Sequence, residues 1–123
     1  MSLPNSIDDI SRLSDTSDES ILSFLRDRFL VDSIYTRVGA SSIVALNPLK
    51  YLHINSDKVL HDYALEYRQT DNSKPRLPPH IFQVAADAYY YMRRSAKDNA
   101  LIMKYVLNIP YSFLVLSLLI LLQ

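Results

Sequence analysis

Two adjacent prolines and the helical pattern behind them constrain this chain more than any other stretch. Pro78 and Pro79 suit the first turn of a helix, because the N–H that proline lacks would have no helical partner there. Apolar residues then recur at steps of three and four, which predicts one buried helical face: Ile81, Val84, Ala85, Ala88 and Met92. The residues on the opposite face are Gln83, Asp87, Tyr91 and Arg94. We therefore expect a helix that packs inside the protein through its alanine-rich side.

A short apolar run follows this helix after a polar turn. Ala100–Met103 suits a buried strand. The residues behind it, Lys104–Pro110, contain no glycine, and the whole chain has one, Gly39. A loop that cradles phosphate needs several glycines so that backbone N–H groups can approach the anion, so we expect no such loop of the usual kind.

The totals exclude several classes of function. A chain of 123 residues suits one modest domain. Its 13 basic and 13 acidic side chains cancel, so no overall field attracts nucleic acid, and we expect no nucleic-acid partner. The absence of cysteine excludes disulfides, thiol catalysis and cysteine-bound zinc, and it fits an intracellular protein.

The beginning of the chain is acidic and rich in serine. Residues 1–20 hold five carboxylates against Arg12 alone, a net charge of −4, and the remainder carries +4. We expect residues 1–17 to form a solvated, mobile and disordered leader. Residues 2–20 also lack the apolar core of a signal peptide.

A capping box, Thr16-Ser17-Asp18-Glu19, predicts a helix start with Thr16 at the cap. The helix should end near Leu30 and bury one apolar stripe, which consists of Ile21, Leu22, Leu25 and Phe29. The residues expected to face away from this stripe are Arg26, Asp27 and Arg28.

Two β-branched runs, Ile34–Val38 and Ser42–Leu46, lie on either side of Gly39 and predict a hairpin. The second run is continuously apolar after its serine, which predicts burial on both faces. Pro48 ends this strand, and Asn47 can bond its own backbone in the turn. Further on, Ser56 and Asp57 predict the cap of a short helix, whose apolar positions are Val59, Leu60, Tyr63 and Tyr67.

Several of these motifs, in this order and at this spacing, resemble the start of a myosin motor head. They are Ile34-Tyr35-Thr36, Val38-Gly39, the run from Ile43 to Lys50, Pro79-His80-Ile81-Phe82, and Ala88-Tyr89. Other stretches look most like the myosin-like heads that are fused to fungal chitin synthases, namely Lys50-Tyr51, the run from Asn55 to Leu60, Tyr63-Ala64, Glu66-Tyr67-Arg68, and the run from Tyr89 to Arg94. The resemblance covers about residues 18–103.

The resemblance implies an ATP-driven, actin-based motor head of the cytoplasm and cytoskeleton, with ATP and Mg²⁺ as ligands. This chain would then be an α/β fragment, with helices and a few strands of the head's central sheet in residues 18–103. A C-terminal hydrophobic tail, residues 104–123, would follow. The family's switch loops and actin-binding regions lie further along than these motifs.

By the same resemblance, the Asn-Pro-x-Lys turn lines the adenine end of the nucleotide pocket. This assigns Asn47, Pro48 and Lys50 to the adenine side. Many members of the family place an aromatic residue eight positions after that Asn to cover the base. Asn55 stands there in this chain, which puts stacking on the base in doubt. Without the resemblance, Asn47-Pro48 would be an ordinary strand-ending turn.

The phosphate site of the family is missing from this sequence. In the family, the strand that corresponds to Ala100–Met103 runs into G-x-x-x-x-G-K-[ST], whose N–H groups and Lys hold phosphate and whose hydroxyl binds Mg²⁺. The residues at that place are Lys104-Tyr105-Val106-Leu107-Asn108-Ile109-Pro110. We therefore expect no tight ATP or Mg²⁺ binding and no hydrolysis by this chain.

No other catalytic or metal constellation compensates for this loss. His53, His61 and His80 lack the spacing of a standard metal motif, and His80 is expected to pack at the start of a helix. No serine stands in a G-x-S-x-G context. The nine tyrosines should fill core and interfaces rather than stack on nucleic-acid bases.

The stretch from Tyr111 to Leu122 is a dense apolar block. It is shorter than the roughly 20 residues that a membrane-spanning helix needs. Extension back to Leu101 reaches that length but includes Lys104 and Pro110. A marginal membrane anchor is therefore one interpretation. Its functional counterpart is a small membrane-tethered interaction protein that uses the fragment as a docking surface.

A translated intron is the other interpretation of residues 104–123. Lys104-Tyr105-Val106 can be encoded by AAG-TAT-GTN, which contains GTATGT, a familiar fungal intron start. The resemblance stops at Met103, one step before the expected phosphate loop. A genomic sequence with no downstream G-x-x-x-x-G-K-[ST] frame would contradict this hypothesis.

Overall fold

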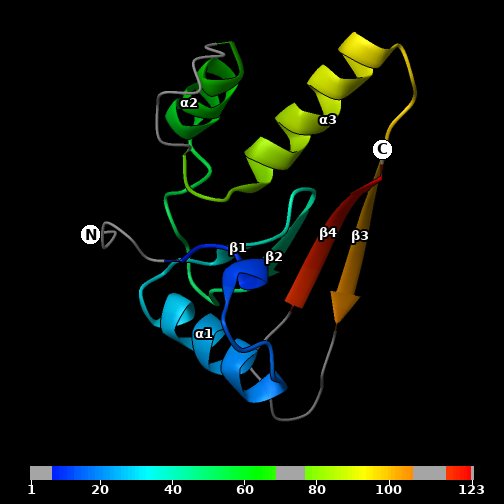
Figure 1. Cartoon of the computed structure of the whole chain (residues 1–123). Coiled ribbons are helices and arrows are strands. Elements are labelled where there is room, and N and C mark those ends of the chain that lie inside the picture. Colours follow the sequence, from blue (N-terminus) through cyan, green and yellow to red (C-terminus); the bar gives the residue numbers. More distant parts are fainter. Residues whose placement is uncertain (1–6, 69–76, 107–115, 123) are drawn as a thin grey trace.

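The computed structural model describes residues 7–68, 77–106 and 116–122. Within these ranges the chain forms three α-helices, a short 3-10 turn and one sheet of four strands (Figure 1). This confirms the expected α/β fragment. The elements in chain order are η1 (Ile10–Arg12), α1 (Asp18–Leu30), β1 (Tyr35–Val38), β2 (Ser42–Leu46), α2 (Asp57–Arg68), α3 (Ile81–Ser95), β3 (Ala100–Val106) and β4 (Leu116–Leu122).

β1 and β2 form the predicted antiparallel hairpin, in a register that pairs Val38 with Ser42. Gly39 closes it with φ +69°, in the left-handed region where glycine carries no Cβ penalty. Successive β2 side chains point to opposite faces of the sheet. Ile43 packs with Val84 and Ala88 of α3.

The other face of β2 carries the larger apolar cluster. Val44 and Leu46 pack there with Leu25 of α1 and with Ile34, and all four are buried. The prediction of a strand buried on both faces is therefore confirmed. The hairpin lies between the two helices, with α1 covering one face of β2 and α3 the other (Figure 1).

The start of α1 lies one residue later than the capping box predicted. Ser17, not Thr16, is the cap, and its hydroxyl accepts a hydrogen bond from the Ser20 N–H at 3.3 Å. The helix ends at Leu30 as expected. Leu22 was assigned to the buried stripe wrongly, since it is 61% exposed.

Arg28 corrects a second sequence-based expectation about α1. It was expected to face away from the core, but its Nε donates to the Thr36 hydroxyl at 2.9 Å and its Nη2 donates to the Tyr35 carbonyl at 2.8 Å. Thr36 is fully buried and needs a hydrogen-bond partner. The guanidinium of Arg28 satisfies these oxygens, and it lies over the ring of Phe24 at 5.7 Å from the ring centroid.

Side chains of α2 form hydrogen bonds with backbone groups of the segment that leads into α3. α2 begins after Ser56, whose hydroxyl accepts from the Val59 N–H at 3.3 Å, as predicted. Tyr63 of α2 is buried, and its hydroxyl donates to the Pro78 carbonyl at 2.6 Å. Glu66 accepts from the Leu77 N–H at 2.7 Å.

α3 begins at Ile81 with His80 as its cap, so Pro78 and Pro79 precede the helix rather than stand in its first turn, and the helix buries a narrower face than predicted. Val84 and Ala88 are buried, whereas Ala85 and Met92 are exposed. Gln83 and Asp87, which were placed on the face opposite the apolar one, both line a cleft.

The sheet has the order β1-β2-β4-β3. β4 lies between β2 and β3 and is antiparallel to both, pairing Leu119 with Ile43 and Ile120 with Ile102. Residues 116–122, within the expected hydrophobic tail, therefore form a strand of the sheet. The rest of the expected hydrophobic tail, 107–115 and 123, lies outside the described residues. Among the described helices, none is long and apolar enough to cross a bilayer.

β3 forms where a strand was predicted, but the prediction that it is buried is wrong. Leu101 is 46% exposed and Ile102 is 43% exposed, although they point to opposite faces. The physical reason is position, because β3 is the outermost described strand on its side of the sheet and pairs with β4 alone.

The acidic leader is held against β1 over the part that is described. The Asp8 carbonyl accepts from the Arg37 N–H at 2.9 Å, and Asp9 forms a parallel β-bridge with Arg37. The Asp9 carboxylate accepts from the Gly39 N–H at 3.0 Å. For these residues the expectation of a solvated, mobile arm is wrong, because β1 offers backbone and guanidinium donors that bind them.

Candidate functional site

The Asn47-Pro48-Leu49-Lys50 turn directly follows β2, so the buried strand fixes where it begins. The Asn47 side-chain oxygen accepts from the Leu49 N–H at 2.9 Å, as the sequence predicted. Leu49 adopts φ +54°, a left-handed conformation that this local hydrogen bond supports. The turn is therefore a defined structure rather than an arbitrary loop.

An ion pair ties this turn to the end of α1. The Lys50 ammonium lies 2.7 Å from the Asp32 carboxylate, and both side chains are about half exposed. Asp32 itself has φ +60° and immediately follows the last turn of the helix. Exposed pairs add little stability, so the pair mainly sets the direction of the Lys50 side chain.

Aromatic side chains lie next to the turn at positions that sequence reasoning missed. The resemblance predicts an aromatic residue at the position of Asn55. Instead, Tyr51 is 82% exposed, and its ring meets that of His53 edge-on with the centroids 4.8 Å apart. Tyr51 stands directly after Lys50. The sequence did contain a signal for this aromatic side chain, because Tyr51 stands in the same loop, at a position other than that of Asn55.

A small cavity of about 250 Å³ adjoins the same loop. His53 and Ile54 line it from the loop, and Asp32 lines it from the end of α1. The remaining walls are mostly apolar and aromatic and include Tyr35, Val59, Tyr63, Pro78, Pro79 and His80.

His80 caps α3, as expected from its place in the sequence. Its Nδ1 accepts from the Phe82 N–H at 3.0 Å, so the ring proton resides on Nε2, which lies 2.9 Å from the Ile54 carbonyl. The rings of Tyr35 and Tyr63 lie 4.7 Å and 5.0 Å from it. Burial lowers the pKa of His80. The imidazole is therefore neutral, and it links the start of α3 to the loop that contains Ile54.

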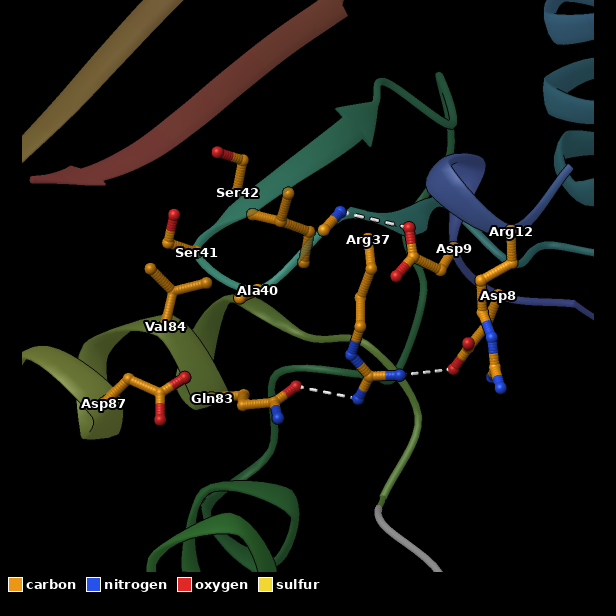
Figure 2. A pocket seen from close by; sticks show the side chains of 12 residues that line it. Asp8, Asp9, Arg12, Arg37, Ala40, Ser41, Ser42, Gln83, Val84 and Asp87 are labelled. Carbon is orange, nitrogen blue, oxygen red and sulfur yellow. Dashed lines mark hydrogen bonds and ion pairs between the residues drawn. The ribbon is translucent and has the colours of Figure 1, made fainter. Parts of the chain in front are cut away.

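A larger cleft of about 560 Å³ lies between the β1–β2 hairpin and α3 (Figure 2). Arg37 spans it, donating from Nη2 to the Gln83 oxygen at 2.9 Å and to the Leu77 carbonyl at 2.9 Å. Its Nη1 forms an ion pair with Asp8. Arg37 therefore holds four segments of the chain together: its own strand β1, the leader at Asp8, the segment at Leu77, and α3 at Gln83.

Asp87 lines the same cleft on α3, one helical turn beyond Gln83 (Figure 2). Burial raises the pKa of Asp87 to about 6, although Arg37 and Arg94 act in the opposite direction. In the described ranges no group of three His, Cys, Asp or Glu side chains could hold a metal ion.

Residues 7–104 match the family model described as myosin head, motor domain. The chain belongs to the myosin motor-head family. The match includes part of the acidic leader and ends at Lys104, the first residue of the stretch in which the sequence departs from the myosin pattern. The division of the chain at residues 17 and 103 stays a prediction.

Relatives within the myosin family include both motors and a chitin synthase. The chain is 40% identical over 106 residues to Chitin synthase 8 of Mycosarcoma maydis, which covers 84% of this chain and 5% of that protein. It is 40% identical over 93 residues to Myosin-1 of Emericella nidulans, covering 76% of this chain and 7% of that protein. It is 36% identical over 101 residues to Unconventional myosin-IXAa of Danio rerio, covering 81% and 4%. The chain thus spans a small part of these myosin-related proteins.

Proposed function

We propose that this chain supplies the adenine side of a myosin-head nucleotide site, with Asn47, Pro48 and Lys50 facing the base. The observation that carries the proposal is the turn itself. It has a defined backbone from the Asn47–Leu49 hydrogen bond and a directed lysine from the Asp32 ion pair. Membership of the myosin-head family supports the assignment of adenine as the ligand.

The chemistry of the turn is compatible with a purine. The Asn47 oxygen is engaged within the turn, which leaves its amide NH₂ as a donor for a ring nitrogen. The exposed Tyr51 ring offers a face for stacking in place of the aromatic that Asn55 replaces.

We further propose that the chain binds adenine compounds weakly and does not hydrolyse ATP. The stretch from Lys104 to Pro110 has neither the glycines nor the Lys-Ser/Thr pair that would hold the phosphates and Mg²⁺. A magnesium ion would therefore lack the Ser or Thr hydroxyl that binds it in the usual phosphate loop. In the longer proteins of this family the same region would serve an ATP-driven, actin-based cytoskeletal motor, with or without a fused chitin synthase.

NMR titration of the 123-residue chain with adenosine and with MgATP tests these proposals. We expect millimolar dissociation constants that agree within about threefold for the two ligands, because both present the same base. Asn47→Ala should abolish the shifts, whereas the matched control Asn55→Ala should leave them unchanged. No response to adenosine would refute the adenine-side assignment. Much tighter binding of MgATP than of adenosine, or release of phosphate, would refute the proposal that the chain lacks the phosphate site.

Actin binding is proposed for the longer family members rather than for this chain. Co-sedimentation with actin filaments tests this, and we expect the chain to remain in the supernatant. The alternative of a membrane-tethered interaction protein has no observation in its favour among the described residues, since 116–122 pair within the sheet. Partitioning of a fusion to residues 101–123 into the membrane fraction would revive it.

A further inference from the structure

β4 fills a position between two strands that precede it in the chain. In the order β1-β2-β4-β3, it separates the hairpin from β3 (Figure 1). Its backbone pairs with β2 over residues 116–120 and with β3 over residues 116–122, antiparallel to both. The space between β2 and β3 is the β2–β3 slot. Without a strand in this slot, the backbone N–H and C=O groups along its two edges would lose their partners.

The edges of the β2–β3 slot and the strand that fills it differ in their relation to the myosin family. β2 and most of β3 lie within residues 7–104, which match the myosin-head model. β4 lies outside that match. Among the described residues, the matched region therefore builds both edges of the slot, and the strand between them comes from beyond it.

The composition of the two edges indicates which kind of strand fits. In β2, Ile43 is 3% exposed and Val44 is 5% exposed, so an unpaired backbone group along this strand would be costly. Across β2 and β3, Lys104 is the one charged residue. β4 itself has Leu or Ile at six of its seven positions. The slot therefore suits an extended apolar segment, which is held mainly by main-chain hydrogen bonds.

We propose that the β2–β3 slot is a docking site for an extended apolar strand, and that residues 116–122 are a built-in occupant. A strand of the same chemistry on another polypeptide can take their place, because main-chain pairing does not require the strand to belong to the same chain. It runs antiparallel to both edges, and its central residue takes the position of Leu119, opposite Ile43 and Met103. Covalent attachment gives residues 116–122 a high effective concentration, so they hold the slot in the intact chain.

Leu119→Pro in the full 123-residue chain tests whether β4 holds the two edges together. Proline has no N–H to donate, and a strand that is paired on both sides needs that group. Hydrogen exchange measured residue by residue with NMR should be about a hundredfold faster or more for the amides of β2 and β3 than in the parent chain. Unchanged exchange in the variant would overturn the proposal.

A peptide with the sequence of residues 116–122, flanked by lysines for solubility, then serves as the free strand. Added to the Leu119→Pro chain, it should restore slow exchange in both β2 and β3. The matched control is the same peptide with proline in place of Leu119, which should restore neither. The parent chain should bind the peptide about a hundredfold more weakly than the variant, because its own strand occupies the slot.

A cross-link tests the register of the docked peptide. The chain has no cysteine, so Ile102→Cys in the Leu119→Pro chain provides a single thiol. In a glutathione redox buffer, a peptide with cysteine at the position of Ile120, which pairs with Ile102, should form a disulfide with that thiol. A peptide with cysteine one position later should not, because neighbouring residues of a strand point to opposite faces.

Three results from the peptide would overturn the proposal. They are a peptide that leaves the exchange of the variant fast, equal cross-linking by the two cysteine peptides, and protection of β3 without β2. The last result would mean that the peptide pairs along one strand instead of entering the slot. Recovery of slow exchange in both strands shows that the variant chain is still able to fold.

Discussion

The guanidinium of Arg37 in β1 donates from Nη2 to the side-chain oxygen of Gln83 in α3 over 2.9 Å. This bond joins the β1–β2 hairpin to α3 across the 560 Å³ cleft (Figure 2). The same guanidinium holds Asp8 and the Leu77 carbonyl, so the leader and the entry to α3 converge on one side chain.

Removal of Arg37 should destabilise the fold more than removal of either partner. Arg37→Ala leaves the Leu77 carbonyl, Gln83 and Asp8 without their donor, and we expect a loss of about 2 kcal/mol in the free energy of unfolding. Gln83→Ala should cost about 1 kcal/mol because the guanidinium keeps its other acceptors. Urea denaturation measures both, with Arg26→Ala as an exposed control near zero. A loss for Arg37→Ala no larger than that of the control would contradict the role of this cluster.

The helix cap offers a test that separates two neighbouring residues. Ser17→Ala should reduce stability by about 1 kcal/mol, because the Ser20 N–H then loses its acceptor. Thr16→Ala should be nearly neutral, since Thr16 precedes the cap. Thermal unfolding followed by circular dichroism compares the pair. The reverse ranking would restore the capping-box assignment that the structure corrects.

His80 should make the protein less stable in mild acid. Its pKa is lowered in the folded state from the ordinary value of 6.5, so below that pH the unfolded chain binds the proton more readily. The free energy of unfolding should therefore fall as pH drops below about 6.5. His80→Gln can keep an acceptor toward Phe82 and a donor toward Ile54, and it should flatten this slope. Urea midpoints measured every half unit of pH for both chains give the comparison, and equal slopes would refute the assignment.

Asp87 should act in the opposite direction. Its pKa is raised in the folded state from 3.8 to about 6, so the folded chain binds the proton more readily and stability falls as pH rises through that range. Asp87→Asn should raise the free energy of unfolding at pH 7 by about 1 kcal/mol, a value discounted for partial solvent access. Carboxyl ¹³C NMR measures the pKa directly. A midpoint near 4 would show that the cleft does not desolvate this group.

Much of the fold could be predicted because it depends on interactions between residues close in sequence. The Asn47–Leu49 bond, the Ser56 cap and the hairpin at Gly39 each form within a few residues, so residue type and spacing suffice to predict them. The turn at Asn47 could be predicted in the same way, whereas its assignment to the adenine side rests on the resemblance to myosin heads and stays a proposal. The Lys50–Asp32 ion pair was not predicted, since its members are separated in the sequence by the two strands β1 and β2.

The orientation of polar helix residues depended on the tertiary structure. Helical periodicity assigns charged and amide side chains to solvent, yet Arg28 turns inward to the buried Thr36 and Gln83 turns toward Arg37. A polar group follows a buried hydrogen-bond partner when one exists, because an unsatisfied buried group costs more than the exposure gains. The helical period of apolar and polar residues does not indicate whether such a partner exists.

The sequence by itself determined the family, the order of the elements from α1 to β3, the buried strand β2 and the absence of a glycine-rich phosphate motif after β3. These follow from local motifs and from the apolar period, which any chain with these residues would share. Only the tertiary structure decided that the acidic leader lies along β1, that Arg37 joins four segments, and that residues 116–122 pair between β2 and β3. Each of these depends on which backbone and side-chain groups meet across long stretches of chain, and pairing over such distances is set by packing rather than by local pattern.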